Sequence, residues 1–204
     1  MKIFFDTEFT GLHQATTLIS LGAVSDDNRT FYAEFGDFDS LYVDKWIQEN
    51  VIDQLRFHPG DKGKGWRNCG TQISKGVTES YGDKQFIKDC FVDWLGNNPI
   101  EFWSDCLSYD WVLLCQLFGG ALKIPQNFYY IPFDICTVLK VKGIDPDINR
   151  EALAFPKAED MKKFRDGLNG IHTGKHNALW DALVIKGCYE KLFPEEAGNR
   201  KEDE

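Results

Sequence analysis

Short apolar segments alternate with longer amphipathic ones along this chain, and their order restricts the folds that it can adopt. Residues 2–6 are apolar and aromatic enough for a buried strand, and residues 16–25 and 29–36 have the composition of two more. Polar residues 26–28 lie between the last two as a turn. The sequence therefore predicts that three antiparallel strands open the protein.

The rest of the chain alternates between helix and strand. Apolar residues recur at helical spacing over residues 41–55, 86–95, 107–118, 135–141 and 176–193. Short strands are predicted over residues 100–103 and 128–133. This alternation after an antiparallel start is typical of a mixed sheet covered by helices, so we expect the α/β class.

Length and composition are those of one globular domain. The 204 residues suit a single core, and 43% hydrophobic with 27% charged residues is an ordinary soluble mixture. We expect this domain to span residues 1–193. Residues 194–204 are expected to form an acidic, disordered tail, because the last ten positions hold five acids and two bases.

Charge and cysteine usage argue against several classes of protein. The net charge of −9 does not suit a non-specific DNA-coating protein, which neutralises phosphates with clustered lysine and arginine. The six cysteines form no Cys-x-x-Cys pair, so we expect reduced thiols in a cytoplasmic protein. No stretch approaches the ~18 apolar residues of a membrane span, and no membrane partner is expected.

A pair of acids ends the first predicted strand. Because strand side chains alternate, Asp6 and Glu8 project to the same side, about 6.6 Å apart at their Cα atoms. Two carboxylates on one face of an apolar strand need compensation, and hard divalent cations are natural partners for them. The alternative is a turn cap, which the following Thr10-Gly11 supports.

A second acid stands among apolar helix residues. Asp110 lies between Leu107 and Leu114 in the predicted helix 107–118, and a buried acid needs a partner. Asp105 is its rival, but a position between a strand and a helix favours the role of N-cap. We therefore favour Asp110 for chemistry.

The third group is His176 and Asp181 at the start of the last predicted helix. On an ideal helix these residues differ by about 140° around the axis, so they do not share one stripe. They can still meet if His176 stands at the very start of the helix. A purely structural histidine is the alternative. A zinc pair formed with His172 is disfavoured by Gly174, which lies between the two histidines.

Taken in order, these motifs resemble the DEDDh exonucleases of the ribonuclease H-like superfamily. The likeness is greatest to the small 3'-5' exoribonucleases named for adenylate preference, the RNase AS-like branch, and it extends from Met1 to about Phe193. The segments that carry it are residues 6–9 (DTEF), 18–22 (LISLG), Trp103 spaced from Tyr109-Asp110, 114–119 (LCQLFG) and 176–182 (HNALWDA).

The resemblance implies a ribonuclease H-like fold and a metal-dependent mechanism. Asp6, Glu8, Asp110 and Asp181 would hold two Mg²⁺ or Mn²⁺ ions, which activate water and stabilise the leaving 3'-oxygen. His176 would be the general base, since its ordinary pKa of about 6.5 suits proton transfer near neutrality. Two dications would also offset the four carboxylates, so an acidic chain need not repel phosphates at this cleft.

Substrate contacts are expected beside the first motif. Phe9 and Leu12 resemble positions that contact the terminal nucleotide in this superfamily, and aromatic stacking accepts any base. A basic loop over residues 56–67 is expected either to guide the strand or simply to be solvated. Further candidates, each with a core role as the alternative, are Thr10, Trp103, Tyr109, Trp111 and Trp180.

The leading hypothesis is a 3'-5' exoribonuclease that shortens single-stranded RNA to nucleoside monophosphates. The same chemistry on single-stranded DNA is the nearest alternative, because the choice depends on contacts to the 2'-hydroxyl. An inactive nucleic-acid-binding module of the same fold and a zinc hydrolase built on His172 and His176 are the others. The resemblance also implies a homodimer.

Overall fold

The centre of the molecule is a seven-stranded mixed sheet with strand order β4-β5-β3-β2-β1-β6-β7. The structure is a computed structural model, and it describes residues 1–57, 70–74, 76–157, 159–162 and 174–198. The predicted α/β class is confirmed. The strands are β1 (Lys2–Phe9), β2 (Leu18–Ser25), β3 (Thr30–Phe35), β4 (Gly70–Ser74), β5 (Val77–Gly82), β6 (Glu101–Ser104) and β7 (Phe133–Asp134).

The predicted antiparallel opening of three strands is also confirmed. β1 pairs with β2, and β2 with β3, both antiparallel. Alternate side chains of β1 enter different cores, Phe4 on one face of the sheet and Ile3 and Phe5 on the other. Burial on both faces explains why these strands are continuously apolar rather than alternating.

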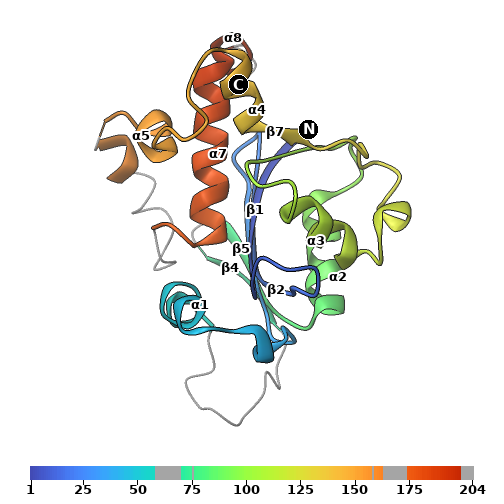
Figure 1. The fold of residues 1–204 in the computed structure, drawn as a ribbon. Helices are drawn as coiled ribbons and strands as arrows, with labels where there is room; N and C mark the ends of the chain where they lie inside the picture. Colours follow the sequence, from blue (N-terminus) through green and yellow to red (C-terminus); the bar gives the residue numbers. More distant parts are fainter. Residues whose placement is uncertain (58–69, 75, 158, 163–173, 199–204) are drawn as a thin grey trace.

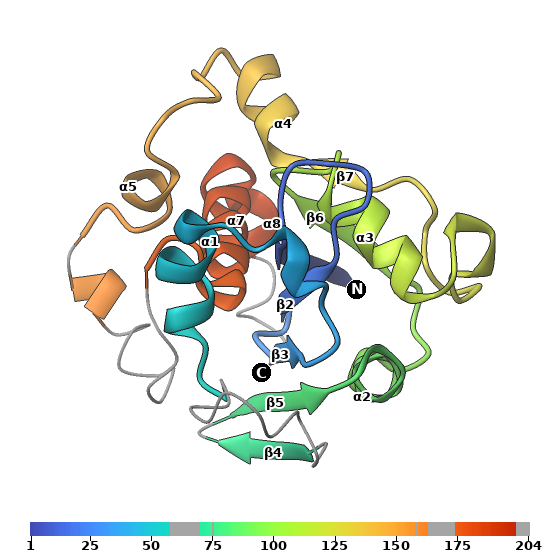
Figure 2. The same cartoon turned by 60° about the horizontal axis from the view of Figure 1, so that its bottom comes forward.

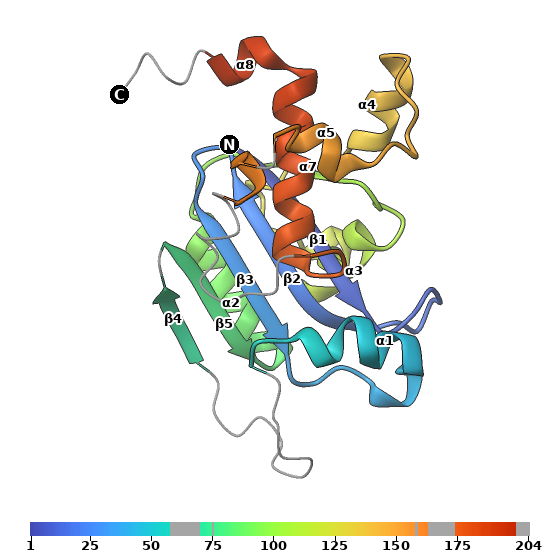
Figure 3. The ribbon, with the colours of Figure 1, turned by 90° about the vertical axis from the view of Figure 1, so that its left-hand side faces the viewer.

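Parallel pairing extends the sheet on both sides of this unit. β6 runs parallel to β1, and β5 runs parallel to β3. The carboxyl ends of β1 and β6 therefore lie at the same edge of the sheet. Figure 3 looks onto the face of the sheet and shows the direction of β1. Residues that follow these two strands are brought together there.

Helices cover both faces of the sheet. Figure 1 shows the sheet nearly edge-on, with α7 and α5 on one side and α2 and α3 on the other. α4 contributes Ile135 and Leu139 to the same core as α7. The helices are α1 (Lys45–Asn50), α2 (Lys84–Leu95), α3 (Asp110–Leu117), α4 (Ile135–Val141), α5 (Arg150–Ala154), α7 (Ala178–Leu192) and α8 (Pro194–Gly198), with 3₁₀ turns η1 (Ser40–Tyr42), η2 (Ile52–Gln54) and η3 (Ala121–Lys123).

The start of α7 rests directly on β2. Gly22 pairs with Asp6 across the β1–β2 ladder, and a Cβ atom added to it would lie 2.2 Å from the backbone of Ala178. Ala178 and Ala182 are completely buried at this contact. The absence of a side chain at Gly22 thus lets the helix approach the strand beside Asp6.

Two predicted helices are shorter than expected. Residues 41–55 form η1, α1 and η2 rather than one helix, because Asp44 caps α1 by accepting from the Ile47 amide and Val51 ends it. Residues 107–118 become helical only from Asp110, and residue 109 occupies the N-cap position. Asp105 is therefore not the N-cap, and that expectation is wrong.

The strands also differ from expectation in two regions. Of the predicted strand 128–133, Phe128 makes only an isolated bridge to Ile100, and β7 is confined to Phe133–Asp134. β4 and β5 were not predicted, because their serine, threonine and glycine content resembles that of a loop. Pairing with β3 gives this polar segment its strand conformation.

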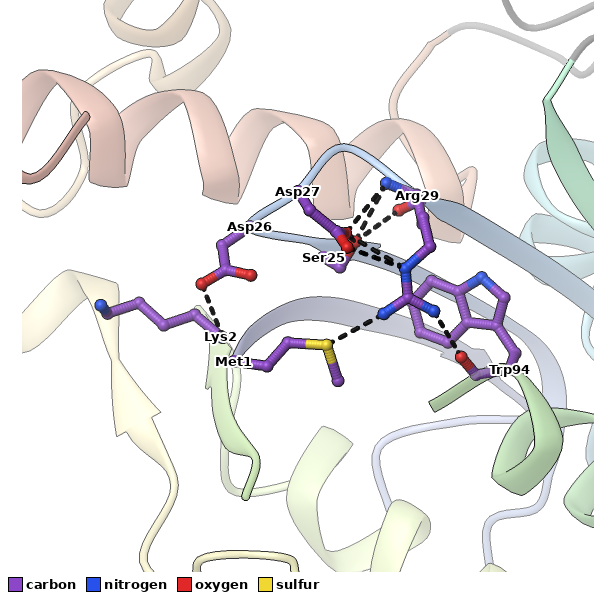
Figure 4. A network of polar contacts seen from close by, with 7 residues as sticks. All are labelled: Met1, Lys2, Ser25, Asp26, Asp27, Arg29 and Trp94. Atoms are coloured by element: carbon purple, nitrogen blue, oxygen red, sulfur yellow. Dashed lines mark hydrogen bonds and ion pairs between the residues drawn. The ribbon is translucent and has the colours of Figure 1, made fainter. Parts of the chain in front are cut away.

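The turn between β2 and β3 lies at the end of the sheet where β1 begins, opposite to the carboxyl end of β1. Arg29 donates to the Trp94 carbonyl oxygen at 2.6 Å and pairs with Asp27 at 3.0 Å. Its guanidinium also lies 5.2 Å from the centre of the Trp94 ring and contacts the Met1 sulfur (Figure 4). These contacts join the N-terminal strand, the turn and α2.

The tail and the cysteines were also the subject of expectations. Residues 194–198 form α8, and Glu196 accepts from the Tyr189 hydroxyl at 2.7 Å, so this part of the expected tail is helical. Residues 199–204 lie outside the described part, and the domain boundary stays a prediction. The five described cysteines are free thiols. None of the described helices has the length and apolar character needed to cross a membrane.

The contact at Gly22 leads to a prediction about stability. Gly22→Ala is expected to lower the free energy of unfolding by about 3 kcal/mol, because the new methyl group meets rigid backbone. Gly187→Ala is the comparison, since its Cβ would meet the Ala154 side chain at 2.7 Å. Urea unfolding should show that Ala154→Gly partly rescues Gly187→Ala, whereas Ala178→Gly does not rescue Gly22→Ala. If Ala178→Gly restored the stability of Gly22→Ala as fully as Ala154→Gly restores that of Gly187→Ala, the contact between Gly22 and the α7 backbone would be contradicted.

Candidate active site

Asp6 and Glu8 lie at the carboxyl end of β1 and face α7. The sequence predicted that strand alternation puts them on one face, and that face is the one that carries Phe4. Asp6 is 9% exposed, and its register partner on β2 is Gly22. Neither acid has a basic partner within salt-bridge distance among the described residues. Within the described part of the chain, no lysine, arginine or histidine therefore balances either carboxylate.

Asp110 reaches the same edge from the start of α3. It is 1% exposed, and both of its carboxylate oxygens accept hydrogen bonds from hydroxyl groups. Thr7 donates to Oδ1 at 2.6 Å and Ser104 donates to Oδ2 at 2.5 Å. These donors come from the ends of β1 and β6, so the paired strands orient the carboxylate.

Asp181 comes from the first turn of α7, and His176 lies just before the helix. Asn177 caps α7 by accepting from the Trp180 amide, which leaves His176 outside the helical turns. The backbone N–H of His176 donates to Asp181 Oδ2 at 3.0 Å. His176 therefore stands just before the helix, as expected from the sequence, and its backbone rather than its imidazole makes the contact with Asp181 in the first turn of α7.

His176 has an unusual backbone and an aromatic neighbour. Its φ of +66° lies in the left-handed region, where residues other than glycine are uncommon and often functional. The imidazole meets the Trp46 indole edge to face, with ring centres 4.8 Å apart. In Figure 2, α1, which carries Trp46, lies in front of α7. Burial and the nearby Lys175 lower the pKa of His176.

Burial, followed by repulsion from neighbouring carboxylates that include Asp105, raises the pKa values of all four acids. Burial raises the pKa of Glu8 to about 8, with a further contribution from Asp181. It likewise raises the pKa values of Asp110 and Asp181 to about 7. The pKa of Asp6 is raised well above its usual range by burial, then by the charge of Asp110. Keeping these carboxylates ionised side by side in a partly buried site costs free energy.

The arrangement of oxygens fits divalent cations. Ligand atoms of Asp6, Glu8 and Asp181 lie within 4.8 Å of one another, and so do those of Asp6, Asp105 and Asp110. Asp6 belongs to both groups, so the two groups adjoin at this residue. Carboxylate oxygens are the ligands preferred by Mg²⁺ and Mn²⁺. Cations bound there would also offset the burial of these charges and the repulsion between them, which together raise the pKa values.

Asp105 lines the cleft, although the sequence predicted only a role as N-cap for it. Its carboxylate pairs with Arg150 at 2.9 Å and is 13% exposed. Burial raises the pKa of Asp105, while the Arg150 charge opposes that rise. Unlike Asp110, whose partners are hydroxyls, Asp105 already has a protein cation beside it.

The acids and His176 line one open cleft of about 630 Å³, within the usual range for ligand sites. Residues 147–151, before and at the start of α5, contribute to the lining. Seven carboxylates but only two permanently charged bases belong to the described lining. The full set is Asp6, Thr7, Glu8, Phe9, Asp105, Cys106, Asp110, Asp147, Ile148, Asn149, Arg150, Glu151, Lys175, His176, Asp181 and Val184.

The expected substrate contacts fall into two groups. Phe9 lines the cleft and stacks on Tyr109 with ring centres 5.0 Å apart. Leu12 is 76% exposed on the loop after β1. Of these three side chains only that of Phe9 lines the cleft, while Leu12 and Tyr109 lie outside its described lining.

The second group does not reach the cleft. Thr10 is completely buried and accepts from the Thr17 amide within its own loop. Trp103 stacks on Phe133 in the α7 core, and Trp180 donates to Glu151 at 2.5 Å. Trp111 packs against the other core. For these residues the structural alternative describes their positions better than substrate contact.

Two residues beside the acids were not singled out from the sequence. Trp46 was assigned only to the apolar stripe of a helix, and its contact with His176 is visible only in three dimensions. Arg150 lies in an irregular segment with no periodic signal. Predictions about the basic loop mostly concern residues outside the described part, as does the zinc alternative through His172.

Comparison with known proteins gives three findings. Residues 1–193 match the family described as "3'-5' exoribonuclease Rv2179c-like domain". Two Mycobacterium tuberculosis proteins, the 3'-5' exoribonucleases Rv2179c and MT2234.1, are each 32% identical over 127 residues, which is 62% of this chain and 67% of theirs. A zinc-bound E. coli ExoI–ssDNA complex aligns with a TM-score of 0.49 and 16% identity, covering 96% of this chain and 40% of that one.

The raised pKa values predict how stability depends on pH without metal. Because Glu8 and Asp110 titrate higher in the folded state than at their ordinary values near 4, the folded state holds extra protons between about pH 4 and 8. The free energy of unfolding in chelator should therefore fall, by an order of a few kcal/mol, as pH rises from 5 to 8. Mg²⁺ should restore more stability at pH 8 than at pH 5.

Urea unfolding at both pH values, with chelator or with Mg²⁺, measures this effect. Asp110→Asn should flatten the pH dependence, because an amide does not ionise. Asp93→Asn, on the exposed surface of α2, should leave the dependence as in the wild type. A metal-free protein that becomes more stable as pH rises would contradict the electrostatic description of the site.

Proposed function

The chain belongs to the Rv2179c-like 3'-5' exoribonuclease family, and from this premise we propose that it hydrolyses single-stranded RNA from the 3' end to nucleoside monophosphates. Family membership makes the protein a 3'-5' exonuclease. The RNA substrate, the use of two cations and the role of His176 are the proposal. The observation that carries it is the meeting of four acids, two of them buried and two half-buried, with one histidine in a single cleft.

The acids suit the binding of two Mg²⁺ or Mn²⁺ ions. Asp6, Glu8 and Asp181 would hold one position, and Asp6 with Asp110 the other. Bound cations would supply Lewis-acid stabilisation of the negative charge that develops in phosphodiester hydrolysis. The hydroxyl groups of Thr7 and Ser104 keep Asp110 oriented, so its geometry does not depend on the ion alone.

His176 is suited to the role of general base. A lowered pKa keeps its imidazole neutral near pH 7, ready to accept a proton from the attacking water. The water oxygen then forms a bond to phosphorus while the bond to the 3'-oxygen breaks, and the leaving 3'-oxygen takes up a proton from solvent water. The products are a nucleoside 5'-monophosphate and a strand with a new 3'-hydroxyl. The Trp46 contact and the Asp181 hydrogen bond limit where His176 can move.

The end of the strand is expected to lie against Phe9 and Leu12. Phe9 is supported from behind by Tyr109, which gives a base a rigid aromatic surface. Stacking of this kind contributes ~1–3 kcal/mol per base and does not distinguish the bases. The names of the M. tuberculosis relatives favour RNA over DNA.

Two further features belong to the proposal. The family resemblance favours a homodimer, which light scattering would test. Free thiols at the five described cysteines agree with a reducing compartment, and we propose the cytoplasm. An inactive binding module is disfavoured, because all five site residues are present together in the cleft.

The substrate and its polarity can be tested in one assay. Matched RNA and DNA oligonucleotides labelled at the 5' end should give a ladder that shortens from the 3' end, with RNA degraded at least ~10-fold faster. Activity should need Mg²⁺ or Mn²⁺ and disappear with chelator. Equal rates of degradation of the RNA and the DNA oligonucleotide would contradict the proposed preference for RNA. Binding of RNA without turnover would instead favour the inactive module.

The role of His176 predicts a separation of chemistry from metal binding. His176→Ala should reduce kcat by at least ~10²-fold, since general-base catalysis contributes ~10²–10⁴-fold. Calorimetric titration should show Mn²⁺ affinity close to that of the wild type, because the carboxylates are unchanged. Asp110→Asn is the contrasting variant and should weaken Mn²⁺ binding. A His176→Ala enzyme with more than about a tenth of the wild-type kcat would exclude this base.

A further inference from the structure

We propose that Arg150 binds a phosphate of the nucleic-acid strand in the cleft, an inference that rests on the proposed function. Arg150 is the first residue of α5, directly after the cap residue Asn149. It lines the same cleft as the acids of β1, α3 and α7. Family membership alone assigns it no role.

The packing of α5 against α7 fixes the position of Arg150 relative to the acids of the cleft. α5 packs closely on α7, and a Cβ atom added to Gly187 would meet Ala154 Cβ at 2.7 Å. Ala154 itself is 6% exposed. Because α7 also carries Asp181, Arg150 is held at a set distance from the acids. A residue fixed in this way can orient a ligand without losing much conformational freedom on binding.

The guanidinium is only partly used by the protein. Nη2 pairs with Asp105 at 2.9 Å, and Nη1 donates to the Pro146 carbonyl oxygen at 3.3 Å, with Cys136 Sγ 3.9 Å away. Its side chain is 34% exposed. The hydrogen bonds that Arg150 makes within the described chain use Nη1 and Nη2 and leave the Nε–H for another acceptor.

The charges around the cleft favour a phosphate as that acceptor. Seven carboxylates line the described cleft, and Arg150 and Lys175 are its only permanent protein cations. Lys175 is exposed, whereas Arg150 is anchored by Asp105. A guanidinium with donors in a planar fork binds phosphate with defined geometry as well as charge. Arg150 is thus the described base best prepared to receive the strand.

The competing explanation is that Arg150 only neutralises Asp105. Removal of Arg150 alone does not separate the two roles, because it leaves an unpaired carboxylate that repels phosphates. The test therefore uses Asp105→Asn as the background, in which no carboxylate is orphaned. Asp105→Asn/Arg150→Gln is compared with Asp105→Asn, and both are compared with Asp105→Asn/Arg150→Lys.

Two measurements report on the phosphate contact. Affinity for a single-stranded RNA is measured by fluorescence anisotropy at several salt concentrations, with Ca²⁺ in place of Mg²⁺ and the RNA checked for integrity. Loss of one phosphate contact should reduce the slope of log K against log[salt] by about 0.7. With Mg²⁺, KM should rise about tenfold while kcat changes less than about threefold.

The controls separate charge from structure. Arg150→Lys keeps the charge, so it should retain the salt slope while losing part of the affinity. Asp105→Asn/Lys84→Gln removes a cation from α2, on the other face of the sheet, and should behave as Asp105→Asn alone. An Arg150→Gln change that leaves slope and KM unchanged in this background would overturn the inference.

Failure of this inference is distinguishable from failure of the proposed function. If the wild type shortens RNA but the slope is unaffected by Arg150→Gln, only the role of Arg150 is wrong. If the wild type neither binds nor shortens RNA, the proposed function falls, and the inference falls with it. If the wild type shortens RNA from the 3' end and Arg150→Gln lowers the slope of log K against log[salt], both the proposed function and the role of Arg150 are supported.

Discussion

The withdrawal of several neighbouring carboxylates from water is the constraint around which this structure is arranged. Asp6, Glu8, Asp110 and Asp181 lie close together and have no basic salt-bridge partner among the described residues, and burial first, then repulsion from neighbouring carboxylates, raises their pKa values. The fold bears the cost of this withdrawal through the apolar packing of β1, α3 and α7, each of which is buried along most of its length. Stability and cation affinity are thereby linked, since the same charges oppose folding and attract metal.

The surrounding residues limit this repulsion in two different ways. Hydroxyl donors from Thr7 and Ser104 hold Asp110 without neutralising it, so its charge stays available to a cation. Asp105 is instead paired with Arg150, which gives the cleft one acid whose charge is already balanced. A site built only from ion pairs would have no need for metal. A site without any pair would be harder to fold.

The parts of the site that depend on local geometry could be predicted from the sequence. The period of two along a strand is enough to put Asp6 and Glu8 on one face, and the breaking of the helix before Ala178 is enough to let His176 reach Asp181. The role of Asp105 was missed because the sequence does not reveal that residues 105–109 form a turn before α3 begins. Trp46 and Arg150 depend on the docking of α1 and α5, which no local pattern encodes.

The seating of α7 on Gly22 has a consequence for the chain during its synthesis. Asp181 and His176 belong to the last quarter of the sequence, while their partners Asp6 and Glu8 emerge first. A nascent chain still lacking α7 has two exposed acids on β1 and no group that completes the cleft. The cleft can therefore be completed only after α7 has been synthesised and has docked on β2, where Gly22 admits it.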